Sequence, residues 1–272
     1  LYNTTDLATI VWREEDYDPD EIIYVVDKRQ ELHFVQVFRC ARKTGLVKPE
    51  TELKFLGFGT MNGKDGKPFK TRDGGVMRLE YLVSEIDNEM LKKITENQKS
   101  KENLGISEEE AKETAKTVAL AAIKYGDLSN QASKDYIFDI DRFTSFEGNT
   151  GPYILYTIVR IKSILNRYVQ EGGDLSTGKI LPAVNASEKN LMLQLSGFAA
   201  MVENAFEEKA PHKICAYIYE VSNAFNSFYH ETKILSEEDQ AQKESFLQLL
   251  QLTRRVLETS IDLLGFSAPD RM

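Results

Sequence analysis

The chain has 272 residues, 42% of them hydrophobic and 28% charged, which is typical of a globular protein long enough for two domains. Its formal net charge of −9 argues against gripping nucleic acid by bulk charge, so any such contact must come from local patches. The sequence has no apolar run near the roughly 20 residues needed to span a membrane.

Cysteine and histidine spacing indicates no metal site. Cys40 and Cys215 are far apart and neither lies in a CxxC pair, and His33, His212 and His230 are equally scattered. We expect two buried thiols, no protein-bound metal and a reducing, cytoplasmic location without membrane contact. The start has neither Met nor a signal-peptide pattern, so we interpret the sequence as a fragment of a longer protein.

The first sixty residues predict a strand, a helix and a second strand. Residues 21–27, EIIYVVD, are apolar and rich in β-branched residues, which predicts a strand buried on both faces. In the next helix Leu32, Val35 and Phe38 recur at helical spacing, and Gly45 suits the position after the helix end. With the second strand, LKFLGFGTM, this is a βαβ unit, which predicts a parallel sheet with ligands at the carboxyl ends of its strands.

A cationic, glycine-rich segment, GKDGKPFKTRDGG at 63–75, follows this second strand. Glycine lets the backbone approach a ligand closely, and Lys and Arg complement phosphate. A solvated hairpin tip would look similar, but the position at a strand end favours a phosphate-binding loop. Neither a P-loop nor GxGxxG fits residues 57–75. The side chains suited to a leaving pyrophosphate are Lys67, Lys70, Thr71 and Arg72.

From about residue 77 the apolar residues follow a 3.6-residue period, which predicts helices for most of the remaining chain. A second helix of this part begins at the capping box Ser107–Glu110 and ends at Gly126. The first helix is predicted to share one apolar face among Leu79, Leu82, Ile86, Met90 and Ile94.

After an extended-looking DYIFDIDRF, four further helices are predicted, beginning near Pro152, Ser187, Pro211 and Ser236. The last of them ends at Gly265. The sequence therefore predicts an α/β part followed by an all-α bundle.

Six stretches, which follow one another along the chain in the family's order, resemble the arginyl-tRNA synthetases, a family of class I aminoacyl-tRNA synthetases. FGTMNGKDGKPFKTRDGG resembles the family's degenerate KMSKS loop. The others are YNTTDLA, DKRQELHFVQVF, KYGDLSNQASKDYIFDIDRFTSFEGNTGPYILY, FNSFYH and LGFSAPDRM. The resemblance implies an arginine–tRNA ligase, which attaches arginine to its tRNA through arginyl-adenylate and uses ATP, with Mg²⁺ accompanying the nucleotide.

The resemblance also implies a domain order. Residues 1–95 would be the second half of a Rossmann-type parallel-sheet catalytic domain with the KMSKS-like loop. Residues 96–146 would be a helical connector, and residues 147–272 an α-helical anticodon-binding domain.

Carried over position by position, the resemblance assigns the substrate arginine to Tyr2, Asp6 and Gln30, and ATP to His33 and Phe34. The Asp6 carboxylate can accept a bidentate guanidinium, and Tyr2 shares its face if the segment is helical. The alternatives are a half-buried Tyr, a capping Asp and a surface Gln, and for His33 a structural histidine without a catalytic role. In the loop, residues 67 and 70–72 take catalytic roles, but Phe69 stands where the motif has Met, and which cation replaces the second lysine stays open.

The predicted anticodon surface begins with Tyr153, Tyr156 and Arg160, which lie on one helical face and could stack on bases and meet the backbone. A helix-packing stripe would have the same spacing. Tyr229 and Met272 match positions that approach the anticodon in the family.

The sequence contains no HIGH motif, and the family's amino-terminal tRNA-binding module is absent from it. We therefore expect the chain alone to bind tRNA weakly and to be inactive, with a monomeric parent enzyme that binds arginine, ATP and arginine tRNA. The alternative is a non-catalytic tRNA-binding module derived from the family.

Overall fold

The computed structural model describes residues 1–67, 78–100 and 107–272, with side chains described to residue 96 in the second range. The chain divides into two compact units. Unit 1 consists of Leu1–Phe69 and Gln131–Ile137, and unit 2 consists of Lys70–Asn130 and Phe138–Met272. Each unit is described by itself below.

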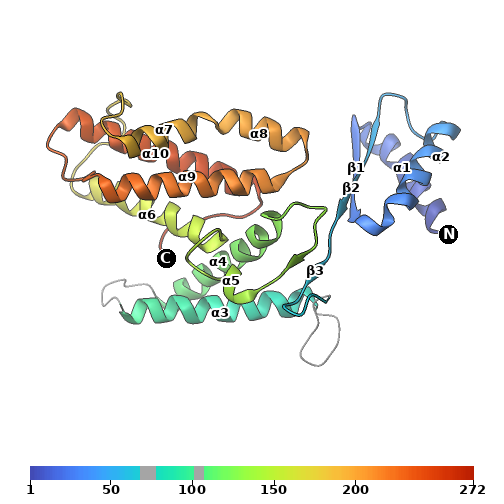
Figure 1. Ribbon diagram of the computed structural model, residues 1–272, viewed down its shortest axis with the longest axis horizontal. Helices are drawn as coiled ribbons and strands as arrows, with labels where there is room; N and C mark the ends of the chain where they lie inside the picture. The colour runs from blue at the N-terminus through green and yellow to red at the C-terminus, as the bar shows by residue number, and fades with distance from the viewer. Residues whose placement is uncertain (68–77, 101–106) are drawn as a thin grey trace. The chain divides into compact units, whose positions relative to one another are not determined.

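Unit 1 is built on two parallel, hydrogen-bonded strands that are connected in the chain by a helix (Figure 1). Strand β1 pairs with β2 in a register that sets Tyr24 opposite Phe55. The βαβ prediction is therefore confirmed, and Gly45 ends the connecting helix with a φ of 69°, which favours glycine. The elements are α1 (Tyr2–Tyr17), β1 (Glu21–Asp27), the 3₁₀ turn η1 (Lys28–Gln30), α2 (Glu31–Thr44), β2 (Glu52–Phe58), β3 (Met61–Asn62) and β4 (Tyr136–Ile137).

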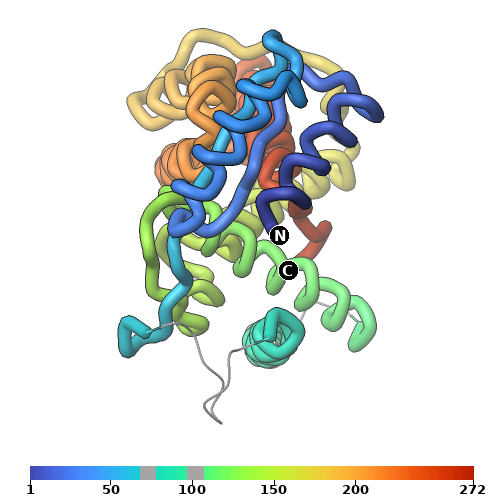
Figure 2. The backbone as a smooth tube through the Cα atoms, turned by 90° about the vertical axis from the view of Figure 1, so that its right-hand side faces the viewer, coloured from blue at the N-terminus to red at the C-terminus, as the bar shows by residue number. Residues whose placement is uncertain are grey.

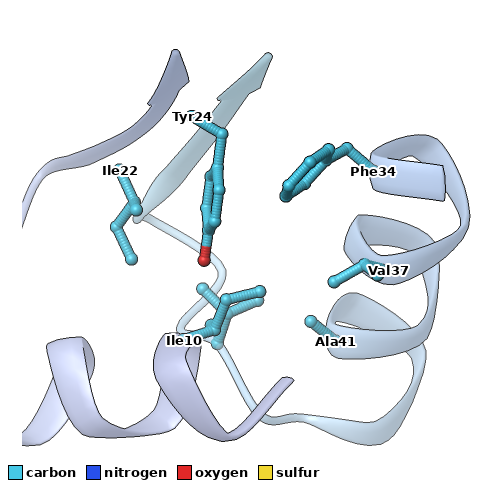
Figure 3. Close-up of a cluster of buried hydrophobic side chains, with 7 residues drawn as sticks. Ile10, Ile22, Tyr24, Phe34, Val37 and Ala41 are labelled. Atoms are coloured by element: carbon cyan, nitrogen blue, oxygen red, sulfur yellow. The ribbon is translucent and has the colours of Figure 1, made fainter. Parts of the chain in front are cut away.

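The core of unit 1 lies between its two long helices and one face of the β1–β2 pair. Figure 3 shows Ile10 of α1 near the hydroxyl end of Tyr24 of β1, while the labelled side chains of α2 extend toward both from the second helix. The buried residues of α2 are Phe34, Val37 and Ala41, whereas Leu32 is 69% exposed. The predicted stripe is therefore wrong at Leu32, whereas its member Phe38 packs against the core and Val35 is half-buried.

The other face of β1 is open. Ile23 and Val25 are 37% and 60% exposed, while their neighbours Ile22 and Tyr24 are buried. The prediction of a strand buried on both faces is therefore wrong within unit 1, since α1 and α2 lie on the same side of the strands (Figure 1). An apolar run predicts that a strand can be covered twice, but the elements packed around it determine whether it is.

Unit 2 is helical. Helices α3 and α4 run side by side, as both Figure 1 and Figure 2 show, and α4 also packs on α6. Four members of the predicted α3 stripe are buried, namely Leu82, Ile86, Met90 and Ile94. The fifth, Leu79 at the start of the helix, is exposed. The helices are α3 (Leu79–Ser100), α4 (Glu108–Leu128), α5 (Ile140–Phe143), α6 (Gly151–Gln170), α7 (Ala186–Ser196), α8 (Phe198–Glu207), α9 (Pro211–Glu231) and α10 (Gln240–Leu263).

The caps of these helices follow the sequence closely. Ser107 accepts a hydrogen bond from the backbone N–H of Glu110 at the start of α4, as the capping box predicts. Pro152 and Pro211 occupy the first turns of α6 and α9. After α10, Gly265 has a φ of 79°, which confirms it as the residue that ends the last helix.

Two predicted helix limits are wrong, and one predicted helix is two. Helix α4 continues past Gly126, which is buried where a Cβ would lie 2.8 Å from the Phe143 ring, so this glycine permits packing and does not end the helix. The helix predicted from Ser187 is two helices, α7 and α8, which meet at Gly197. The last helix begins after Asp239, because the Asp239 carboxylate caps the N–H of Gln242.

The two cysteines differ in environment. Cys40 on α2 is exposed, so the expectation that both thiols are buried is wrong for it. Cys215 on α9 is fully buried, and burial raises the pKa of its thiol to about 12.

We expect the folded chain to show one fast-reacting thiol with Ellman's reagent and a second that reacts only after denaturation. The thiolate is the reactive species, and burial disfavours both its formation and its access to the reagent. The Cys40→Ser variant should lose the fast reaction completely. Two fast thiols in the native chain would contradict the buried position of Cys215.

Candidate functional sites

In unit 1, helices α1 and α2 bring together two polar residues that the sequence assigned to different ligands. Nε2 of His33 lies 2.6 Å from Oδ2 of Asp6, and both side chains are 26% exposed. An ionised carboxylate only accepts hydrogen bonds, so this contact requires a proton on Nε2 of His33. Among the described residues, Oδ1 of Asp6 has no hydrogen-bond partner.

The other two residues predicted to bind arginine lie at the surface. Tyr2 is 87% exposed, and since α1 is helical from Tyr2 it shares the face of Asp6 one turn later. Gln30 is exposed at the start of α2, where its side chain makes no capping hydrogen bond. The alternative of a capping role does not apply to Asp6, which lies inside α1.

The predicted ATP residues His33 and Phe34 differ in environment. Phe34 is 4% exposed and packs against Tyr24, Phe38 and Phe55, with ring centroids 4.8 to 5.8 Å away. Its side chain belongs to the core of unit 1, so the structure gives it a packing role. Its contact with ATP stays a prediction.

At the carboxyl end of β1, charged residues form a hydrogen-bonded turn that sequence reasoning missed; we call it the fixed turn, and it centres on Asp27 and Arg29. Arg29 donates to the Asp27 carboxylate from its backbone N–H and from its side chain, which holds the pKa of Asp27 at about 2. Lys28 donates to Asp135 at 2.9 Å, and Asp135 also accepts from the backbone N–H of Thr60. The available signal was that Asp27 and Asp135 lie within stretches already noted for their resemblance.

The predicted catalytic loop is described only at its beginning. Lys67 is exposed; its N–H donates to Asp65, and its carbonyl oxygen accepts from the N–H of Gly63 at 2.8 Å. Lys70, Thr71 and Arg72 lie outside the described residues, so their roles stay predictions. Gly59, just before the loop, has no space for a Cβ, which would lie 2.3 Å from the Lys134 carbonyl oxygen.

In unit 2, the predicted anticodon residues of α6 and α9 form one cluster. The guanidinium carbon of Arg160 lies 4.7 Å from the centroid of the Tyr156 ring and 5.1 Å from that of Tyr229. Cations over aromatic rings are held by the electrostatics of the ring face. Tyr229 is 37% exposed and the other two are half-buried, so the cluster reaches the surface. Such contacts also occur between helices that only pack together, so a role in anticodon binding stays a prediction.

Two asparagines of α9 extend this cluster, and sequence reasoning missed both. Asn226 accepts from Nη1 of Arg160 at 2.7 Å and donates to the Tyr153 hydroxyl at 2.8 Å. The hydroxyl in turn donates to Asn223 at 2.8 Å. Burial raises the pKa of Tyr153, which keeps the hydroxyl protonated as a donor. The stretch FNSFYH contains Asn226, but only the packing of α9 on α6 indicates its role.

The carboxyl-terminal tail is attached to α6. Nζ of Lys162 donates to the Pro269 carbonyl oxygen at 3.3 Å and to Asp270 at 3.1 Å, and the Lys162 side chain is only 13% exposed. Met272 at the chain end is half-buried. The tail that bears Met272 is thus anchored to the helix that bears Arg160.

No group of three or more His, Cys, Asp or Glu residues that could hold a metal ion occurs in the part of the chain that the structure describes. Over the same residues, no helix is both long and apolar enough to cross a bilayer.

Comparison with known proteins identifies the family. Residues 1–140 match the family model described as the catalytic domain of class I tRNA synthetases (R), where R denotes arginine. The chain belongs to the arginyl-tRNA synthetases. Residues 154–272 match the DALR anticodon binding domain. The arginyl-tRNA synthetase match contains Asp6 and His33, and the DALR match contains Arg160 and Asn226.

Individual relatives agree with this assignment. The chain is 72% identical over 274 residues to the arginine–tRNA ligase of Agathobacter rectalis and 58% identical over 272 residues to that of Alkaliphilus oremlandii. It superposes on the arginyl-tRNA synthetase of Plasmodium falciparum with a TM-score of 0.82 at 25% identity. All of this chain is covered in each comparison, but only 46%, 45% and 44% of the respective relatives. The chain thus spans less than half the length of these arginyl-tRNA synthetases.

Proposed function

We propose that this chain is the part of an arginine–tRNA ligase that supplies a portion of the active site and the anticodon-binding surface. One observation carries the proposal: a catalytic-domain match and an anticodon-domain match follow each other on one chain. The relatives named arginine–tRNA ligase, which are similar over the whole chain, support it. The reaction would join arginine to the α-phosphate of ATP and then transfer it to the terminal ribose of arginine tRNA.

Asp6 would bind the guanidinium of the substrate arginine. The contact with His33 uses one acceptor position of Oδ2 and orients the carboxylate, which leaves Oδ1 and the second position of Oδ2 to accept a guanidinium fork. Tyr2 and Gln30 would complete this contact from the exposed side. A lysine substrate would offer a single ammonium in place of the guanidinium fork, so the carboxylate favours arginine.

The loop after β2 would act on ATP. Lys67, Lys70, Thr71 and Arg72 would stabilise the negative charge that develops on the leaving pyrophosphate. Mg²⁺ would arrive with ATP, and His33 and Phe34 would lie near the nucleotide. The fixed turn at Asp27 and Arg29 supports this placement, since ligands of parallel sheets bind beyond the carboxyl ends of the strands.

The cluster of α6 and α9 would bind the anticodon arm of arginine tRNA. Tyr156 and Tyr229 offer ring faces to bases, and Arg160 offers charge to the backbone or to base edges.

We also propose a division of the chain into three parts: residues 1–95 serve catalysis, residues 96–146 connect the two domains, and residues 147–272 bind the anticodon. The enzyme would be monomeric and cytoplasmic. Helix α3 runs across the first of these boundaries.

The test is aminoacylation by the full-length gene product, with radiolabelled arginine and arginine tRNA. We expect ATP-dependent charging with arginine and none with lysine. The isolated 272 residues should show no arginine-dependent ATP–pyrophosphate exchange, because they contain no HIGH motif. Failure of the full-length protein to charge arginine would leave a tRNA-binding relative without the ligase activity. Exchange by the isolated chain would contradict the assignment of only part of the active site to it.

A further inference from the structure

We propose that Asn226 is a positioning residue that aims the Arg160 guanidinium while leaving its positive charge unneutralised. The proposal rests on the proposed function, because it concerns the surface that would bind the tRNA. It adds a residue of α9 that contributes no ring and no charge of its own.

The contacts of Asn226 determine the orientation of its amide. Its oxygen accepts from Arg160 and its nitrogen donates to the Tyr153 hydroxyl. A guanidinium only donates, so turning the amide over would place two donors against each other. The Tyr153 hydroxyl then donates onward to Asn223. Each group in this chain of hydrogen bonds therefore has one compatible direction.

Arg160 is consequently held from three sides. Tyr156 and Tyr229 contact the guanidinium with their rings, and Asn226 binds Nη1. A guanidinium carries five N–H donors, of which Asn226 takes one, so donors remain for phosphate or base edges. Holding a flexible side chain in its bound geometry lowers the entropy cost of binding.

The choice of a neutral partner has a consequence for affinity. An aspartate at position 226 would hold Arg160 at least as firmly, but the ion pair would cancel its charge. The chain has a net charge of −9, so a tRNA meets general repulsion and depends on local cations. An asparagine fixes Arg160 without removing that cation.

The experiment measures tRNA binding by the full-length protein over a range of salt concentrations. For Asn226→Asp we expect Kd for arginine tRNA to rise roughly tenfold and the slope of log Kd against log salt to fall by roughly one, the value for one lost phosphate contact. The aspartate gains an ion pair with Arg160 and loses the hydrogen bond to the Tyr153 hydroxyl, so we expect little net change in melting temperature. For Asn226→Ala we expect a smaller rise in Kd with the slope unchanged, because the charge remains. Ser227→Asp adds the same charge at an exposed neighbouring position and controls for net charge.

A second comparison separates positioning from general structure. In an Arg160→Ala background, Asn226→Asp should have no further effect on the salt slope. An Asn226→Asp protein with the wild-type slope, or an equal effect of Asn226→Asp with and without Arg160, would overturn the proposal. Charging of arginine tRNA by the wild-type protein at saturating tRNA, measured in parallel, tests the proposed function separately, since saturation removes the effect of a change in Kd. A wild-type protein that bound no tRNA would overturn both.

Discussion

Replacing Asp6 by alanine in the full-length protein is expected to lower kcat/KM for arginine by about 1.5 to 3.5 orders of magnitude. The variant removes the carboxylate that would bind the guanidinium, and truncating one partner of a hydrogen-bonded charge pair costs about 2–5 kcal/mol. Each 1.4 kcal/mol corresponds to about a tenfold change. The measurement is arginine-dependent ATP–pyrophosphate exchange, in which saturating arginine should recover part of the lost rate.

Two further variants define the origin of that loss. Asp6→Asn keeps the size of the side chain and an acceptor for His33, so an intermediate loss is expected from the missing charge alone. Asp16→Ala removes an exposed carboxylate from the same helix and should leave the kinetics within about twofold of wild type. Unchanged arginine kinetics in the Asp6→Ala protein would show that this carboxylate does not bind the substrate.

Replacing Gly151 by alanine is expected to destabilise unit 2 by about 2–4 kcal/mol, the upper range for overpacking a buried site. A Cβ at this position would lie 2.3 Å from the carbonyl oxygen of Ala121 and 2.6 Å from its carbonyl carbon. These are backbone atoms of α4, so no side-chain rotation relieves the clash and α4 and α6 must separate. Thermal denaturation should show a melting temperature lower by roughly 5–15 °C.

Gly197→Ala is the matched control. Gly197 also lies at a helix end in unit 2, but its φ is −80° and a Cβ would lie 3.4 Å from the Gln194 carbonyl oxygen. Alanine fits that backbone conformation and reduces the freedom of the unfolded chain, so a change between 0 and about 1 kcal/mol in the stabilising direction is expected. Equal melting temperatures for the two variants would contradict the close approach of α4 and α6.

Local sequence patterns predicted most of the elements because their causes are local. The β-branched run of β1, the Ser107 cap of α4, the first-turn prolines of α6 and α9 and the left-handed Gly45 each act within a few residues. The limits that failed had other causes. Gly126 resembles a residue that ends a helix, yet it lies inside α4. Glycine is needed there because the Phe143 ring of a different helix leaves no space for a Cβ.

The candidate sites divide in the same way. The resemblance placed Tyr2, Asp6, Arg160 and Tyr229 by their spacing and neighbours. The contact of Asp6 with His33 joins residues 27 positions apart, and that of Arg160 with Asn226 joins residues 66 positions apart. No periodicity carries that information, so His33 was assigned only to ATP and Asn226 to nothing.

The sequence alone therefore determined the family, the order of an α/β part and a helical part, and the residues proposed to bind arginine and tRNA. The tertiary structure alone decided which face of β1 is covered, that Phe34 is a core side chain, and which partners hold Asp6 and Arg160. The reason is physical. Helix caps and strand propensity arise from neighbouring residues, whereas burial and hydrogen-bond partners arise from elements that the fold brings together from distant parts of the chain.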